Sequence, residues 1–294
     1  MTTDNRLTYG GQAVIEGVLI RGQRCASVAV RRPNGTIAHR TDPINPFFTG
    51  LFRRVPLVRG IIALIEMLSL GMRSLVYSAN VGIEEEEEEI GKGTMAAVIT
   101  FSLLTGIGLF FLVPVLIISP LEGVLGSDIA SNFAEGVIRL SIFLTYIWAI
   151  GKMKQIHRVF MYHGAEHMTV HAQEHGDPLE IDIVRRYPKA HPRCGTAFLL
   201  IVVIVAALVF SFVGRDPLWW LITSRIVLVP FVAALSYEIV RFSGFHSENI
   251  LVKFFAAPSL LLQSMTTNNP DDDQIEVAIT AMEQAISGDA KYMP

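Results

Sequence analysis

The sequence contains little cysteine and little charge, and both shortages narrow the class of protein. Only Cys25 and Cys194 occur in 294 residues, and the polar N-terminus shows no secretory cleavage signal. We therefore expect no disulfide framework, and regard Cys194 as a thiol or a metal ligand. Charged residues make up 17% of the chain and hydrophobic residues 51%, with a mean hydropathy of +0.44. Such an apolar chain is typical of a membrane protein rather than a soluble enzyme.

Net charge is also small, and its distribution along the chain is uneven. The formal charge is −3, so no overall basic field would attract nucleic acid, and we expect no nucleic-acid partner. Residues 119–136 contain three acidic and no basic residues. Residues 151–195 contain seven basic residues. By the positive-inside rule, residues 151–195 are predicted to be cytoplasmic.

Apolar runs predict about four transmembrane helices, because roughly 20 apolar residues span a bilayer. The expected spans are residues 95–118, 138–150, 197–213 and 226–240, the last extended by residues 221–225. We expect the second span to continue as helix into the following histidine-rich stretch. Four crossings would place both termini in the cytoplasm, in a protein of the cytoplasmic membrane whose main partner is the lipid bilayer.

The predicted fold class is a mainly α, polytopic membrane protein with a small N-terminal antiparallel β-sheet and interfacial helices on the cytoplasmic side. Residues 13–20 and 27–31 have strand patterns, and Pro33-Asn34-Gly35 favours a hairpin turn. We expect Gly10-Gly11 and Gly17 to serve turns or bulges. The expected domains are a β domain at 1–55, an interfacial helix and acidic linker at 56–94, a membrane domain at 95–265 with a His-rich loop at 151–195, and a C-terminal helix at 266–294.

Two further helices are expected outside the membrane. Residues 56–80 carry Arg59, Glu66 and Arg73, whose burial in lipid would be costly, so this helix is predicted to be interfacial or packed on the membrane domain. The glutamate run 84–89 is typical of a solvated linker. A last helix is expected to open at Asn269-Pro270 and to dock on the sheet or on a partner through one apolar face, made of Ile275, Ala278, Ile279, Met282 and Ile286.

Histidines cluster in the predicted cytoplasmic loop, where six of the eight lie between residues 157 and 191. His163, Glu166 and His167 form His-x-x-Glu-His, the reverse of the His-Glu-x-x-His zinc motif. Histidines four apart share a helix face, so both imidazoles can bind one ion while Glu166 acts as general base. A second copy spans residues 171–175, but a helix turns about 120° between His163 and residue 175, so we favour the first copy.

The topology offers several third ligands. His191 and Cys194 precede the third span, and Glu238 lies where the fourth span exits, so all are expected near the depth of the histidine motif. Any of the three could complete a zinc site, or Glu238 could orient a histidine. The competing interpretations are a loop residue for His191, a packing residue for Cys194, and an ion pair for Glu238 with Arg241 or Arg225.

Several motifs in order resemble those of the YqhQ family of bacterial membrane proteins. They are Gly10 to Gly17 with Arg21-Gly22, Tyr162 to His167, His191 to Thr196, Ser236-Tyr237-Glu238, and Thr266-Thr267 with Asp271 to Ala278. The resemblance covers nearly the whole chain. It implies a multi-pass membrane protein described as a predicted metal-dependent enzyme, without implying a reaction.

The sequence leaves two main hypotheses for function. The leading one is a metal-dependent hydrolase, with zinc as the expected divalent metal, that acts at the cytoplasmic membrane surface on a lipid-linked molecule or a membrane-proximal peptide. The alternative is a non-catalytic scaffold or assembly factor in which these residues form a structural metal site or a polar network. Metal transport ranks last, because it would need acidic or histidine pairs midway through several spans.

Overall fold

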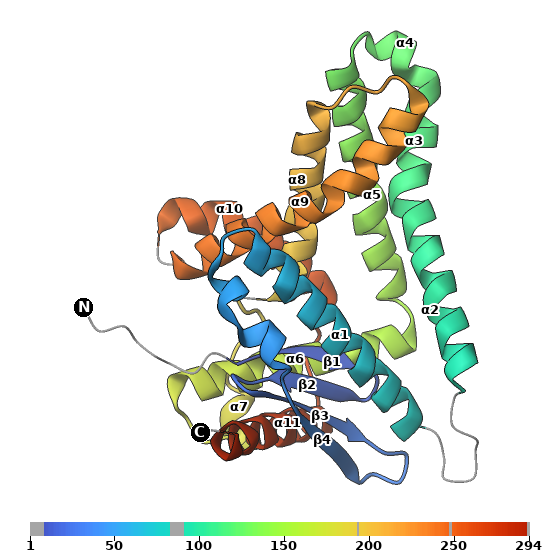
Figure 1. The fold of residues 1–294 in the computed structure, drawn as a ribbon. Coiled ribbons are helices and arrows are strands. Elements are labelled where there is room, and N and C mark those ends of the chain that lie inside the picture. Colours follow the sequence, from blue (N-terminus) through green and yellow to red (C-terminus); the bar gives the residue numbers. More distant parts are fainter. Residues whose placement is uncertain (1–8, 83–90, 193, 247–248, 293–294) are drawn as a thin grey trace.

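The computed structural model describes residues 9–82, 91–192, 194–246 and 249–292. A bundle of long helices stands on a layer that combines the N-terminal sheet with the C-terminal helix (Figure 1). The predicted fold class is confirmed: the chain is mainly α, has several apolar helices long enough to cross a membrane, and carries a small antiparallel sheet. The predicted acidic linker at 84–89 and Arg193 lie outside the described residues.

Four strands form the sheet in the order β1-β2-β3-β4, all antiparallel. They are β1 (Gly10–Val14), β2 (Gly17–Arg21), β3 (Cys25–Arg31) and β4 (Ile37–Pro43). The single strand expected at 13–20 was wrong, because the chain reverses at Ile15-Glu16, where Glu16 has a φ of +50°. The hairpin turn at 33–35 is confirmed between β3 and β4, with Gly35 at a φ of +86°.

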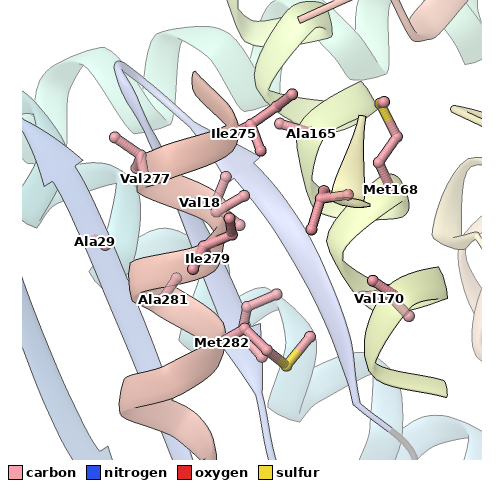
Figure 2. Close-up of a cluster of buried hydrophobic side chains, with 14 of the residues drawn as sticks. Val18, Ala29, Ala165, Met168, Val170, Ile275, Val277, Ile279, Ala281 and Met282 are labelled. Carbon is pink, nitrogen blue, oxygen red and sulfur yellow. The ribbon is translucent and has the colours of Figure 1, made fainter. Parts of the chain in front are cut away.

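Successive side chains of the strands face opposite layers. On one face, Val18 and Ala29 pack against α6 (Lys154–His175) and α11 (Asp272–Lys291) in the cluster shown in Figure 2. On the other face, Leu19 and Val28 pack against Leu70 and Tyr77 of α1 (Val58–Val81). The sheet is therefore covered on both sides, and its α6 side carries the histidine motif.

The C-terminal helix docks largely as predicted. Ile275, Ala278, Ile279 and Met282 are buried against the sheet and α6, whereas Ile286 is 37% exposed. The predicted start at Asn269 was wrong: Asp271 is the N-cap, and it forms a reciprocal capping box with Gln274. Asp271 Oδ1 accepts from the N–H of Gln274, and Gln274 Oε1 accepts from the N–H of Asp271, both at 3.0 Å.

Asp289 fastens the far end of α11 to the β2–β3 turn. Its buried carboxylate accepts hydrogen bonds from the backbone N–H groups of Gln23, Arg24 and Cys25 at 2.8, 2.8 and 3.1 Å. Burial alone would raise the pKa of Asp289, but these donors outweigh it and lower the pKa. Its stabilisation is therefore present above the ordinary pKa of aspartate and is lost as pH falls through the lowered value.

We expect Asp289→Ala to lower the free energy of unfolding by about 2–3 kcal/mol, because three buried amides lose a charged acceptor. Denaturant unfolding of the detergent-solubilised protein measures this. Glu283→Ala, on the exposed side of the same helix, is the control and should change stability by less than about 0.5 kcal/mol. Equal effects of both changes would contradict this role for Asp289.

Within the described residues, four helical segments are long and apolar enough to cross a membrane: α1, the run Gly93–Leu125, α5 (Asp128–Ile150), and Trp219–Gly244 within α9 (Leu218–Phe245). The run Gly93–Leu125 begins within α2 (Lys92–Ile107) and continues through η3 (Gly108–Leu112), α3 (Val113–Ile118), η4 (Ser119–Leu121) and α4 (Glu122–Leu125). A fifth apolar helix, α8 (Gly195–Ser211), is shorter. The remaining helices are η1 (Pro46–Thr49), η2 (Leu51–Arg54), α7 (Ile181–Val184) and α10 (Ile250–Thr266).

Helix α1 is long and apolar enough to cross a membrane, yet both of its halves pack against other parts of the protein. Leu70 and Tyr77 contact the sheet, and Gly60 lies against Ala234 of α9. Its buried Glu66 forms ion pairs with Arg21 and Arg53. The second half of α1 thus covers the sheet and its first half packs on α9, while the interfacial position expected for residues 56–80 stays a prediction.

Helix continuity between the second span and the histidine motif was wrongly expected. Helix α5 ends at Ile150 with Gly151 as its C-cap, and α6 begins at Lys154. Helix α6 then runs beside the sheet instead of extending the line of α5 (Figure 1). The break therefore places the histidine motif between the bundle and the sheet.

A buried cluster of charges lies in the part of the bundle far from the sheet. Glu135 of α5 accepts hydrogen bonds from Arg139 at 2.5 Å and from Arg215 at 2.7 Å. Arg225 of α9 donates to Asn132 at 2.7 Å and lies 3.4 Å from Glu135. Each of these three arginines is at most 5% exposed. Glu135 thus pairs with all three guanidinium groups, and Arg215 also pairs with Glu122.

Candidate metal centre

His163 and His167 project from the same face of α6, as their spacing predicts. His163 Nδ1 lies 2.9 Å from the carbonyl oxygen of Thr266, and His167 Nδ1 lies 2.7 Å from that of Lys189. A carbonyl oxygen can only accept, so Nδ1 of each ring carries the proton. Both Nε2 atoms are then left with a lone pair, the form in which histidine binds a metal.

Cys194 meets the two Nε2 atoms. Its Sγ lies 3.2 Å from His163 Nε2, and one ligand atom from each of His163, His167 and Cys194 falls within 4.8 Å of the others. Cys194 is the N-cap of α8, and its sulfur accepts from the backbone N–H of Thr196 at 3.4 Å. Two imidazoles and one thiolate form a ligand set that suits zinc.

Close backbone contacts hold α6 in this position. A Cβ atom on Gly164 would lie 2.2 Å from the carbonyl oxygen of Asn268, so only glycine lets α6 approach the α10–α11 connection. A Cβ atom on Gly11 would lie 2.5 Å from Leu19 O and 2.8 Å from Glu166 Cγ. The turn or bulge expected at Gly10-Gly11 was therefore wrong for Gly11, which lies within β1 and permits close packing against α6.

Glu166 is 4% exposed and lies beside the proposed ligands. Its Oε2 is 3.4 Å from His167 Nε2, and the N–H of Gly11 donates to its carboxylate. Burial raises the pKa of Glu166, and the neighbouring His163 and His191 oppose the increase only in part. A carboxylate next to a metal position can accept a proton from bound water and return it to a leaving group.

His191 lies near this set but in a second group, formed with His171 and Glu174. Its Nε2 is 3.4 Å from Glu174 Oε2, and Gln263 holds its backbone through two hydrogen bonds of 2.9 Å. Burial lowers the pKa of His171 and His191, which favours neutral rings. The second copy of the motif contains His171 and Glu174, but His191 is 17 positions after Glu174 and joins them only through the tertiary fold.

Glu238 is not brought to the histidines. It pairs with Arg59 of α1 and accepts a hydrogen bond from the backbone N–H of Leu57 at 3.0 Å. Arg225, considered as a partner from the sequence, pairs with Glu135 instead. The structure thus gives Glu238 an ion pair between α1 and α9, and of the predicted ligands it groups His163, His167 and Cys194.

These features define a polytopic membrane protein with a His-His-Cys cluster where its bundle meets a sheet layer. The family described as "Protein of unknown function (DUF1385)" matches residues 55–288, and the chain belongs to that family. The chain is 32% identical over 293 residues to the "Uncharacterized protein YqhQ" of Bacillus subtilis (strain 168), covering 95% of this chain and 92% of that protein. The resemblance to the YqhQ family is confirmed. No solved structure matches the chain.

Proposed function

We propose that the protein is a membrane-bound hydrolase in which His163, His167 and Cys194 hold a zinc ion at the membrane surface. The observation that carries this proposal is the orientation of the two histidines: each donates Nδ1–H to a backbone carbonyl, so both Nε2 atoms converge with Cys194 Sγ. Metal-binding histidines are commonly fixed in this way. Three protein ligands also leave a fourth position for water or substrate, as in catalytic zinc sites.

The roles of the surrounding residues follow from their contacts. Zinc at this position would supply a Lewis acid and an acidified water for attack on a carbonyl or phosphoryl group. Glu166 would take the proton from the water and return it to the leaving group, since its carboxylate lies 3.4 Å from His167 Nε2. The carbonyl groups of Thr266 and Lys189 hold the imidazoles in the binding tautomer.

Glu166→Gln separates catalysis from metal binding. We expect this variant to keep its metal and to lose at least about 100-fold in turnover, because the amide cannot accept the proton. Metal content is measured by elemental mass spectrometry, and turnover with a panel of ester, phosphoester and peptide substrates in vesicles. Unchanged turnover in a metal-loaded Glu166→Gln protein would contradict the assigned role.

His191→Ala tests which group of ligands holds the ion. Because His191 pairs with Glu174 and lies outside the His163–His167–Cys194 group, we expect this variant to retain its zinc with an affinity within about 10-fold of the unmodified protein. Competition with a chelator of known affinity measures this. Loss of the ion from His191→Ala would place the metal in the second group instead.

The second candidate function is a scaffold with a structural metal site. It is favoured by one observation: the candidate ligands and their acceptors come from α6, the segment before α8, and the end of α10, so an ion would tie these segments together. Structural zinc sites have four protein ligands, whereas catalytic sites keep one position open. Binding of a small anion to the cobalt-substituted protein, seen in its visible spectrum, favours the hydrolase, and no spectral change favours the scaffold.

A further inference from the structure

A cavity of about 660 Å³ lies at the break between α5 and α6. Its walls are the end of α5, the first turns of α6, the end of α10 with Met265, and the connection from α10 to α11 with Asn268. Cavities of this size hold drug-sized ligands. The break that the sequence did not predict therefore creates a space large enough for a lipid head group.

The cavity is basic. Lys152, Lys154, His157 and Arg158 contribute to its lining, and among the described residues no acidic side chain does so. Arg158 forms two hydrogen bonds of 2.6 Å with Glu16, which neutralises its charge. Lys152 and Lys154 are exposed and supply the positive charge that remains. This net positive charge of the cavity lining favours an anionic ligand.

The cavity also has the surroundings of a membrane interface. Trp148, 59% exposed, lines it from the last turn of a helix long and apolar enough to span a bilayer. The Lys152 ammonium lies 5.4 Å from the centre of its ring. Tryptophan is enriched at the head-group level of membranes, and basic side chains there attract anionic lipids. The charge at the membrane surface favours a lipid phosphate over a soluble anion.

The cavity adjoins the candidate metal centre through shared segments. Thr266, whose carbonyl accepts from His163, lies between the cavity residues Met265 and Asn268. The N–H of Asn268 also bonds to Phe160 O on α6 at 2.8 Å. His157 precedes His163 by six residues, a rise of about 9 Å along the helix. A lipid held in the cavity would therefore have its linkage region close to the ion.

We propose that this cavity binds the phosphate head group of an anionic lipid from the adjacent leaflet, and that the substrate of the metal centre is a lipid of this class. The first part stands on the cavity alone. The second part rests on the proposed hydrolase function.

Native mass spectrometry of the full-length protein, with phosphatidylglycerol and phosphatidylcholine in competition, tests the proposal. We expect a preference for phosphatidylglycerol that falls roughly 10-fold or more in the double variant Lys152→Gln/Lys154→Gln, since each basic residue near a membrane surface contributes several-fold. Arg186→Gln/Lys291→Gln removes the same charge from exposed positions outside the cavity lining and should keep the preference. A further experiment measures the binding of inorganic phosphate alone.

The outcomes separate the two parts of the proposal. Equal retention of both lipids, equal effects of the two double variants, or phosphate binding without any lipid preference overturns the lipid site. If the protein contains metal but shows no lipid preference, the lipid site is overturned and the hydrolase proposal is unaffected. If the protein contains no metal but its lipid preference depends on Lys152 and Lys154, the result supports the lipid site and contradicts the hydrolase proposal. Metal content unchanged in the double variant, together with lost preference, supports the lipid site next to an intact metal centre.

Discussion

Replacing Glu135 by alanine is expected to destabilise the helix bundle by about 3–5 kcal/mol, the usual cost of removing one partner from a buried ion pair. Glu135 is 1% exposed and lies within hydrogen-bond or ion-pair distance of Arg139, Arg215 and Arg225. Without the carboxylate, Arg139 and Arg225 would lose the acidic group with which they pair, and Arg215 would keep its ion pair with Glu122. Thermal unfolding of the protein in detergent, followed by circular dichroism, measures the change.

Glu122 provides the matched control, because it is also a glutamate paired with Arg215 but its side chain is 37% exposed. Glu122→Ala should cost no more than about 1 kcal/mol. Adding Arg225→Leu to Glu135→Ala should recover part of the lost stability, since it removes one of the unpaired charges. A Glu135→Ala protein as stable as Glu122→Ala would show that the arginines do not depend on this carboxylate.

Cys194→Ser is expected to lower zinc affinity by more than about 100-fold, beyond the 10–100-fold usual for losing a residue that merely orients a ligand. The serine hydroxyl is a much poorer zinc ligand than a thiolate at neutral pH. Chelator competition with the purified protein measures the affinity. His163→Ala and His167→Ala should have effects of at least similar size.

Cys25, the other cysteine of the chain, provides the control for this experiment. Cys25 is buried against α11, where its sulfur lies 3.3 Å from Ala285 O, and burial raises its pKa to about 12. Cys25→Ser should therefore retain the zinc. Loss of zinc from Cys25→Ser at unchanged stability, or its retention in Cys194→Ser, would contradict the proposed ligand set.

The sequence predicted those parts of the fold that depend on local patterns. Apolar runs indicated membrane helices, and helical spacing placed His163 and His167 on one face, as the structure has them. The docking face of α11 followed from its periodicity, with Ile286 as the exception. The break between α5 and α6 was missed because Gly151 alone is a weak helix terminator, and the direction of α6 is set by its packing on the sheet.

The candidate site was only partly predictable because its third member depends on tertiary contacts. Cys194, His191 and Glu238 all lie near predicted span ends, and hydropathy gives their depth but not their position around the bundle. Glu238 faces α1, where Arg59 reaches it, and Cys194 faces α6. The carbonyl acceptors of Thr266 and Lys189 could not be inferred, because every residue carries such a group.

Zinc stoichiometry combined with X-ray absorption spectroscopy tests the central claim most directly. We predict about one zinc ion per chain, with one sulfur ligand at about 2.3 Å and two imidazole nitrogens at about 2.0–2.1 Å, completed by a light atom that is not from a protein side chain. Zinc without a sulfur ligand would contradict the assignment of Cys194. A protein that contains no metal after chelator-free purification, and takes up none on reloading, would contradict the metal centre as a whole.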